Sequence, residues 1–395
     1  MARLENIEGG VCAANGFYAD GIYIGLKKEG AKDLAFVYSK TPCTIASVFT
    51  TNKMTAAPIR HFRQKGNFEG NFVLINAKNA NAMTGPAGIT DIDEVLTLLQ
   101  AKFPQIQHPV MSSTGVIGVR LPKAKIIEGA MNFDLTRRDG VAASEAIMTT
   151  DTFPKRMAYE VTLENGTSFR IGAMAKGAGM INPAMATMLC FITTDASVDK
   201  GTMQAILDSC VSTTFNAASV DGDTSTNDTV LLMANGESGV FDADAFKEAL
   251  EKIMLFLAKE MVRDGEGATK LVTYKVTGAL NDHEAEMAAK ALSNSLLVKT
   301  ALFGEDPNWG RIASTVGASG VMCDEATLSI WFDDVCVYRK GELLFDEKLE
   351  PLAAAVMQKE SFTIHCDIGQ GEGQFMAYGC DLGHEYVKIN ADYRT

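Results

Sequence analysis

The chain has no closely paired cysteines and no long apolar run, and each absence excludes a class of protein. None of its eight cysteines forms a CxxC pair or a Cys/His spacing suited to zinc. The longest apolar stretch lies around Met185 to Ile192. A helix that spans a bilayer needs roughly 20 apolar residues, far more than this stretch provides. We therefore expect no metal, no other cofactor and no membrane-spanning helix.

Positive charge is also in short supply. Lysine and arginine number 36 against 49 aspartates and glutamates, which gives a formal net charge of −13. A field of that sign repels phosphate backbones and anionic membrane surfaces. We expect neither nucleic acid nor a membrane as a partner, whereas small polar substrates remain open.

An export signal is missing as well. The first residues carry charges at Arg3, Glu5 and Glu8 and contain no apolar core of the kind a secretory signal needs. Without export, the scattered cysteines are expected to be buried, reduced thiols. The sequence therefore predicts a cytoplasmic protein.

What is present is the balance of a soluble globular protein. Over 395 residues, 47% are hydrophobic and 22% are charged, which is enough apolar material for one large domain or two. Strand-like and helix-like segments do not alternate one for one, so an α+β layered fold is favoured over a doubly wound sheet. The Gly-rich turn DGEGATK (264–270) predicts a boundary between residues 1–270 and a C-terminal domain, 271–395.

The expected elements follow from composition and periodicity. Runs rich in β-branched and aromatic residues predict strands at 34–38, 71–76, 157–163, 187–192, 229–234, 327–332, 361–366 and 386–391. Apolar residues at helical spacing predict helices at 91–103, 202–216, 245–261, 283–297 and 349–358. Because the end of the chain stays apolar, we expect it to be held against the fold.

The most unusual segment is KGAGMINPAMATMLCFITTD (176–195). A Gly-rich stretch with Lys176 leads through small residues to Thr187 at the start of an apolar run. The simpler interpretation is a loop that feeds a buried strand. The alternative is a nucleophilic threonine, whose hydroxyl needs a neighbouring base. None of the five histidines is near in sequence. The threonine's own α-amine could serve if the Ala186–Thr187 bond were cut, because such an amine titrates near ~8.

Three further segments are rich in polar or turn-forming residues. In MSSTGVIGVR (111–120), Thr114 and Gly115 offer a hydroxyl and a backbone N–H to a developing oxyanion, or simply form a turn before a strand. DGDTSTNDT (221–229) lacks the pattern of a calcium loop and is interpreted as a hydrogen-bonded polar loop. FGEDPNWGR (303–311) is a turn that the fold could need for its shape alone.

Together these strings closely resemble the ornithine acetyltransferase (glutamate N-acetyltransferase) family of arginine biosynthesis. The resemblance covers nearly the whole chain. It is carried in order by SVFTTNKMTAAPI (47–59), MSSTGVIG, AIMTTDT (146–152), KGAGMINPAMATML, VDGDTSTNDT, DGEGATK, LVKTALFGEDPNWGRI (297–312) and the terminal YVKINADYRT. So many separately spaced matches are far more specific than any one motif.

The resemblance implies a fold and a set of site residues. The fold would be a layered α/β/β/α sandwich with a smaller C-terminal α+β domain, as in the L-aminopeptidase/D-amidase group. Thr187 would be the nucleophile, with self-cleavage after Ala186 giving an α chain of 1–186 and a β chain of 187–395. Thr114 and Gly115 would form the oxyanion hole. The remaining substrate contacts implied are Thr150, Lys176, Glu266, Asn390 and Thr395, together with Thr187 itself.

The resemblance also implies the reaction. By ping-pong chemistry, Thr187 would take acetyl from N2-acetylornithine, release ornithine and pass the acetyl group to glutamate. Lys176 could bind a substrate carboxylate, and Glu266 could bind the cationic amine of ornithine. The family forms an α2β2 heterotetramer of cleaved chains. Whether acetyl-CoA is a second donor stays open, because both kinds of family member share these motifs.

Two departures from the family pattern stand out. Asn182 and Ala184 occupy positions where the family usually reads GMIHPNMAT, and Ala77 and Lys78 stand where Ser and Gly are common. They put supporting hydrogen bonds in question but leave the threonine, the oxyanion pair and the lysine intact. Two rival functions remain: an N-terminal-threonine amidohydrolase or aminopeptidase that uses water, and a non-catalytic metabolite-binding protein.

Overall fold

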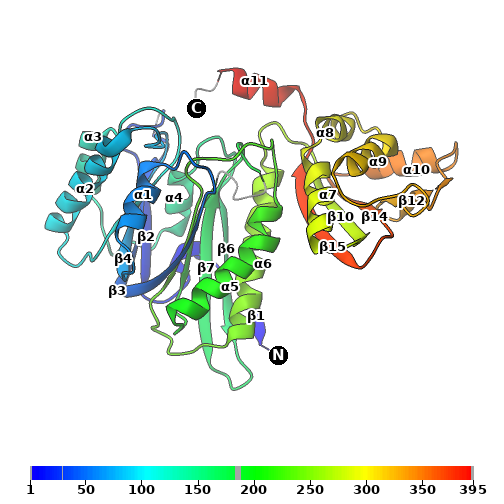
Figure 1. Cartoon of the computed structure of the whole chain (residues 1–395). Helices are drawn as coiled ribbons and strands as arrows, with labels where there is room; N and C mark the ends of the chain where they lie inside the picture. Colours follow the sequence, from blue (N-terminus) through cyan, green and yellow to red (C-terminus); the bar gives the residue numbers. More distant parts are fainter. Residues whose placement is uncertain (1, 29, 183–187, 393–395) are drawn as a thin grey trace.

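The computed structural model describes residues 2–28, 30–182 and 188–392, and within these ranges the chain builds two β-sheets with flanking helices (Figure 1). The strands are β1 (Arg3–Asn6), β2 (Phe17–Ile22), β3 (Leu34–Phe49), β4 (Gly70–Asn76), β5 (Val110–Ser113), β6 (Lys155–Thr162), β7 (Ser168–Lys176), β8 (Leu189–Thr194), β9 (Thr229–Ala234), β10 (Leu271–Ala279), β11 (Ser329–Phe332), β12 (Val335–Arg339), β13 (Glu342–Leu343), β14 (Ser361–Asp367) and β15 (Gly373–Cys380). The fold is therefore mixed α+β, as the sequence predicts.

Eleven α-helices lie within the described ranges, together with short 3-10 helices at Gly10–Cys12 and Phe215–Ala217. They are α1 (Ala57–Gln64), α2 (Gly85–Lys102), α3 (Lys123–Ala130), α4 (Gly140–Ala146), α5 (Lys200–Thr213), α6 (Ala243–Arg263), α7 (Asp282–Asn294), α8 (Leu296–Phe303), α9 (Trp309–Ala318), α10 (Leu349–Met357) and α11 (His384–Asp392). No helix among the described residues is both long and apolar enough to cross a membrane.

The larger sheet has nine strands and is organised around the long strand β3. Its order is β1-β6-β7-β8-β9-β3-β4-β5, with β2 paired to β3 outside this path. The first part of β3 pairs with β2 and β4, whereas its last six residues, Thr44–Phe49, pair with β9. The register shifts between Tyr38 and Cys43, so that β3 joins two halves of the sheet. One half contains β2, β4 and β5, and the other runs from β9 to β1.

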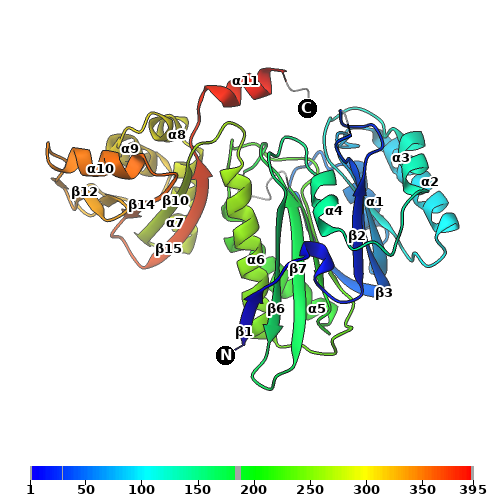
Figure 2. The ribbon, with the colours of Figure 1, turned by 180° about the vertical axis from the view of Figure 1, so that it is seen from behind.

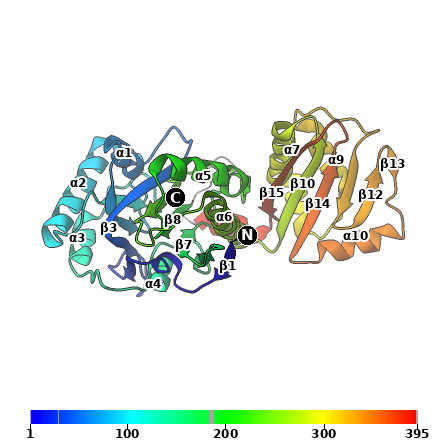
Figure 3. The same cartoon turned by 90° about the horizontal axis from the view of Figure 1, so that it is seen from below.

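Three apolar clusters pack against these halves. One joins side chains such as Val37 and Ile75 with Phe191 and Leu231, and so takes residues from both halves. A second covers the β6–β9 half with residues of α5 and α6. A third packs α2 and α3 against β3 and β4. Figure 3 shows α5 and α6 on one side of the larger sheet and α2 and α3 at the other. Burial of apolar surface is the main force that holds such layers together.

The smaller sheet is built from residues after Lys270. Its order is β13-β12-β11-β14-β10-β15, and a separate apolar cluster packs α7, α9 and α10 against it. Figures 1 and 2 show this second unit beside the larger sheet and α11 crossing back toward the larger sheet. The final helix therefore belongs in sequence to the C-terminal region but lies over the N-terminal one.

Most of the predicted elements are present with small changes at their ends. The predicted strands at 229–234 and 361–366 and the predicted helix at 245–261 correspond to β9, β14 and α6. The predicted helix at 283–297 is two helices, because the side chain of Ser295 accepts the N–H of Val298 and starts α8.

The predicted strand at 386–391 is wrong, because this segment lies in α11. Its Val and Ile suggested a strand, but β propensity is easily overridden by tertiary contacts. As a helix, the segment places Tyr386 and Asn390 one turn apart on the same face, and the Asn390 side chain donates to the Tyr386 carbonyl at 3.0 Å. Val387 is left 66% exposed, which a core strand would not tolerate.

Candidate active site

A cavity of about 190 Å³ gathers residues from seven separate segments of the chain beneath α11. Six of the residues singled out in the sequence line it: Thr114, Gly115, Thr150, Lys176, Glu266 and Asn390. Three others, Ala186, Thr187 and Thr395, lie outside the described residues. The next residue along the chain, Met188, is described and buried at the start of the path into β8.

Thr114 follows directly after β5. Its backbone N–H is occupied by the Asn76 carbonyl at 3.1 Å, and its side chain is 4% exposed. The Lys176 Nζ donates to the Thr114 Oγ1 at 3.5 Å, at the long limit of a hydrogen bond. Because the hydroxyl accepts from the lysine, its own proton is available to an acceptor in the cavity.

Gly115 is a position that only glycine can occupy. Its φ is +133°, and a Cβ there would lie 2.2 Å from the backbone carbonyl carbon of Lys78. Among the described residues, the Gly115 N–H has no hydrogen-bond partner, while the next N–H, that of Val116, donates to the Lys78 carbonyl. The unpaired N–H and the Thr114 hydroxyl are two neighbouring donors of the kind that stabilise an oxyanion.

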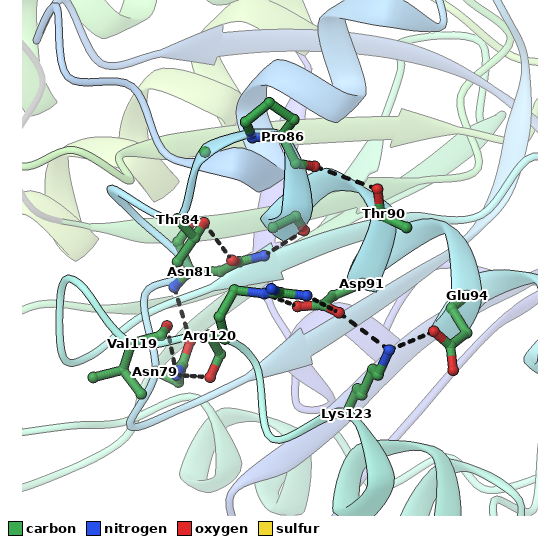
Figure 4. A network of polar contacts seen from close by, with 12 residues as sticks. Asn79, Asn81, Thr84, Pro86, Thr90, Asp91, Glu94, Val119, Arg120 and Lys123 are labelled. Carbon is green, nitrogen blue, oxygen red and sulfur yellow. Dashed lines mark hydrogen bonds and ion pairs between the residues drawn. The ribbon is translucent and has the colours of Figure 1, made fainter.

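The loop behind this pair is held by a network of side chains (Figure 4). Asn79 donates to the carbonyls of Val119 and Arg120, and Asn81 donates to the Gly88 carbonyl. Figure 4 shows the Arg120 guanidinium facing the buried carboxylate of Asp91, with N–O distances of 2.5 and 2.7 Å. The loop that carries Ala77 and Lys78 is therefore fixed by its asparagines, which the two departures leave in place.

Lys176 ends β7 and is 3% exposed. Its nearest carboxylate is Asp151, with the Lys176 Nζ 4.0 Å from Asp151 Oδ2. Burial lowers the pKa of Lys176, and the charge of Asp151 counters that effect. The ammonium group is therefore placed between a carboxylate and the Thr114 hydroxyl on the wall of the cavity.

Glu266 is held by the residues around it. Its backbone N–H donates to the Ala178 carbonyl at 2.8 Å, and its carboxylate accepts from Asn390 Nδ2 at 2.8 Å. A Cβ at Gly179 would lie 2.5 Å from this carboxylate, so the glycine makes room for it. The end of the chain was expected to be held against the fold, and as far as residue 392 helix α11 does this by reaching the cavity through Asn390 and Tyr386.

The loop at 221–229 is hydrogen-bonded, as expected, but it also lines the cavity. Asp221 accepts the backbone N–H groups of Met180 and Ile181 at 2.6 and 2.9 Å, and the Tyr386 hydroxyl donates to it at 3.2 Å. Asn227 donates to the carbonyls of Ala80 and Ser113, and so ties the loop to the oxyanion segment. The 221–229 loop thus connects three walls of the site.

Asp228, at the end of that loop, is fully buried beside the segment that enters β8. Its Oδ1 accepts the N–H of Met188 at 2.9 Å, and among the described residues its Oδ2 has no hydrogen-bond partner. Burial raises the pKa of Asp228 well above the ordinary value, although the Met188 N–H and the charge of Lys176 act in the opposite direction.

Sequence reasoning missed the roles of Asp151, Asp221 and Tyr386. Asp151 and Asp221 stood within matched strings, AIMTTDT and VDGDTSTNDT, but their contacts join residues far apart in the chain. Tyr386 fell in the segment assigned to a strand. None of the five histidines is among the residues that line the cavity. Within the described ranges, no group of three or more His, Cys, Asp and Glu side chains is arranged to hold a metal ion.

Comparison with known proteins shows the family of the chain. The ArgJ family model matches residues 18–395. The arginine biosynthesis bifunctional protein ArgJ of Wolinella succinogenes is 62% identical over 396 aligned residues, covering 100% of both chains. These matches confirm the resemblance seen in the sequence.

Two solved structures are also similar. A crystal structure of the arginine biosynthesis bifunctional protein ArgJ from Bacillus halodurans is 42% identical, with a TM-score of 0.49 over 51% of this chain and 98% of that one. The ornithine acetyltransferase of Mycobacterium tuberculosis, solved with ornithine, is 33% identical, with a TM-score of 0.40 over 48% of this chain and 100% of that one. From the family match and the full-length relative, the chain belongs to the ArgJ family of arginine-biosynthesis acetyltransferases.

Proposed function

We propose that this acetyltransferase moves an acetyl group from N2-acetylornithine to glutamate through an acetyl ester on Thr187. The observation that carries the proposal is the convergence of the Thr114 hydroxyl, the Gly115 N–H and the Lys176 ammonium in one cavity. Two oxyanion donors can stabilise the tetrahedral intermediate of an acyl transfer, and the cation can bind the carboxylate of an amino-acid substrate. Membership of the ArgJ family supports the same reaction.

Self-cleavage between Ala186 and Thr187 precedes the reaction. The hydroxyl of Thr187 attacks the carbonyl carbon of Ala186, the peptide C–N bond breaks, and one water then hydrolyses the resulting ester. The products are an α chain, 1–186, and a β chain, 187–395, whose masses sum to the full chain plus one water. The freed α-amine supplies a base on the same residue as the hydroxyl, and no histidine is among the described residues that line the cavity.

In the first half-reaction, the Thr187 hydroxyl oxygen attacks the acetyl carbonyl of acetylornithine. Its proton passes to the α-amine of Thr187, while Thr114 and Gly115 stabilise the negative charge on the carbonyl oxygen. The C–N bond then breaks, and the α-amine returns that proton to the nitrogen of the departing ornithine.

In the second half-reaction, the amine of glutamate attacks the acetyl-threonine ester. The ester C–O bond breaks, and the proton of the glutamate amine passes through the same α-amine to the threonine oxygen. N-acetylglutamate leaves, and the Thr187 hydroxyl is restored. Lys176 binds the carboxylate that both substrates share, and Glu266 binds the side-chain amine that only the ornithine substrates carry. Thr150, Asn390 and Thr395 complete the substrate contacts.

The experiment compares wild-type protein with Thr187→Ala. Intact-mass analysis is expected to give two fragments for the wild type and a single uncut chain of 42.4 kDa for the variant, because the variant lacks the attacking hydroxyl. With acetylornithine and glutamate, wild-type initial rates are expected to give the parallel double-reciprocal lines of ping-pong kinetics. A variant cut at the same bond, or intersecting lines, contradicts the proposal.

The same assay separates the rival functions. An N-terminal-threonine amidohydrolase of related fold releases acetate whether or not glutamate is present, whereas the transferase forms N-acetylglutamate and needs it. A binding protein forms neither product. Acetyl-CoA in place of acetylornithine tests the second donor. The relative from Wolinella succinogenes is a bifunctional protein, which supports this second activity.

The proposal also covers the domains of the protein, its assembly and its location in the cell. Residues 1–270 form a catalytic α/β/β/α sandwich and residues 271–395 a C-terminal domain; the apolar cluster of the smaller sheet, whose members all follow residue 270, supports this division. The cleaved chains assemble as an α2β2 heterotetramer. The protein works in the cytoplasm, in keeping with eight cysteines that are all unpaired.

A further inference from the structure

Asp151 is a completely buried carboxylate that makes contacts on two sides of the cavity. On one side, its Oδ2 accepts the backbone N–H of Thr149 at 3.0 Å, next to Thr150. On the other side, its Oδ1 accepts the backbone N–H of Gly177 at 2.7 Å, and its Oδ2 lies 4.0 Å from the Lys176 Nζ. Thr149, Thr150 and Lys176 line the cavity, but Asp151 does not.

Asp151 belongs to a buried cluster of two carboxylates and two ammonium groups. The Lys155 Nζ lies between Asp151 and Asp264, at 2.8 and 2.5 Å, and Lys176 approaches Asp151 alone. Asp264 also accepts the backbone N–H of Thr152. The charges therefore balance only while both carboxylates are present.

This balance decides whether Lys176 can carry its charge. A buried ammonium is costly unless an opposite charge is close. Burial lowers the pKa of Lys176, Asp151 raises it, Lys155 lowers it, and Asp228 and Glu266 raise it. Burial disfavours the ionised form of Asp151, yet Lys176 and Lys155 hold the pKa of Asp151 at about 2. Of the groups that face Lys176, Asp151 is the only carboxylate joined to it in an ion pair among the described residues.

We propose that Asp151 is a positioning residue: it fixes Lys176 against the cavity wall, keeps its ammonium group charged, and joins the 149–150 segment to the end of β7. The inference rests on the proposed function, because it deepens the role of Lys176 as the group that binds the substrate carboxylate. Asp151 itself touches no substrate. Its effect is exerted on KM, through the fraction of Lys176 that is charged.

The test compares Asp151→Asn with Asp264→Asn. Both variants remove one carboxylate from the same buried cluster and from the same Lys155, but only the first removes the partner of Lys176. Asparagine keeps one acceptor oxygen, so in Asp151→Asn it can accept the N–H of Thr149 or that of Gly177 but not both, and the thermal midpoint records the cost of that loss. The KM for acetylornithine is measured from pH 6 to 10 in cleaved protein of known thermal midpoint.

In the wild type, KM is expected to rise as Lys176 loses its proton. In Asp151→Asn this rise is expected to move down by about one pH unit, so that KM at a pH on the rise is about tenfold higher. In Asp264→Asn the curve is expected to stay within a factor of two of the wild type. If folded Asp151→Asn shows the same dependence of KM on pH as the wild type, the proposal is wrong. It is also wrong if Asp264→Asn shifts this dependence as far as Asp151→Asn does.

A second variant covers a failure to fold. If Asp151→Asn alone is unfolded, the double variant Asp151→Asn with Lys155→Gln removes one charge of each sign and is read in the same assay. Because Lys155 lowers the pKa of Lys176, the reference for this variant is Lys155→Gln alone, and the rise in KM is expected at lower pH in the double variant than in that reference. Coinciding curves for the two overturn the proposal. The proposed function is checked separately by Lys176→Met. If wild type transfers acetyl and Lys176→Met raises KM while Asp151→Asn does not, only the role of Asp151 is wrong. If Lys176→Met leaves KM unchanged, the proposed role of the lysine fails.

Discussion

At the scale of single residues, the chemistry depends on hydrogen-bond donors that are left for a substrate once the neighbouring residues have used the other polar atoms. The Thr114 backbone N–H is used by Asn76, and its hydroxyl oxygen accepts from Lys176, so the hydroxyl proton is what remains for a substrate. Gly115 offers its N–H because no side chain fits beside Lys78. Each of these donors can be tested by one substitution.

Replacing Thr114 with Ala is expected to lower kcat by about 10²–10³, the usual cost of losing one oxyanion donor. The effect on KM is expected to be smaller, because the contact strengthens in the transition state. The assay must use protein confirmed by mass to be cut, since the same donors serve self-cleavage. An unchanged kcat in fully cut protein would remove Thr114 from the mechanism.

The identity of the base can be tested by pH. If the α-amine of Thr187 is the base, kcat/KM for acetylornithine is expected to rise with pH through one ionisation at or below about 8, the ordinary value for such an amine. Lys176 would disfavour the ammonium form and lower that pKa. Replacing the five histidines one at a time is expected to leave this rise in place. Loss of both activity and the rise in any folded, cut variant would assign the base to that histidine.

At the scale of elements, the site depends on where strands end and on one returning helix. β5 ends at Ser113, directly before Thr114, and β7 ends at Lys176, while the 221–229 loop ends where β9 begins. Helix α11 then closes the cavity, with the Asn390 side chain 2.8 Å from Glu266 and the Tyr386 hydroxyl 3.2 Å from Asp221. The helix therefore orients a carboxylate that we assign to the ornithine amine.

Removing the Asn390 side chain tests this role of the helix. Asn390→Ala is expected to raise KM for acetylornithine about tenfold, because a hydrogen bond to a charged group contributes about 1.5–3 kcal/mol. Lys388→Ala is the matched control. It lies on the same helix, and its ion pair with Glu385 is exposed, so its loss is expected to change little. Equal effects of the two variants would mean that α11 acts only as a whole.

At the scale of the whole molecule, the cut proposed after residue 186 would divide a single sheet between two chains. β8 and β9 follow the cut, yet they lie between β7 and β3, which precede it. Their hydrogen bonds to β7 and β3 and the cluster that packs residues of both halves would all join one chain to the other.

We therefore expect the two fragments to stay together after cleavage. On gel filtration without denaturant they should elute as one species, and they should separate only when the protein is unfolded. The uncut Thr187→Ala variant provides the reference for a single chain. Elution of a free β chain from folded, cut protein would contradict the shared sheet.

Much of the fold and site could be predicted because the signals are local. The runs that form β9 and β14 are dense in β-branched residues, and the apolar stripe of α6 has helical spacing. The matched strings also contain the six predicted site residues that are found among those lining the cavity. The error at 386–391 arose because that segment's conformation is decided by what Tyr386 and Asn390 contact, and not by its own propensity.

By itself, the sequence determined the chemistry available to this protein. A threonine behind small residues, a Thr-Gly pair and a lysine in a Gly-rich stretch were recognisable in the printed chain, because those properties belong to residues and their neighbours in sequence. Only the tertiary structure decided which charges meet. Asp151 lies between Lys155 and Lys176, and Glu266 meets Asn390 across 124 positions. Burial makes such pairs matter, since it removes the water that would otherwise stabilise each charge alone, and burial is a property of the folded chain.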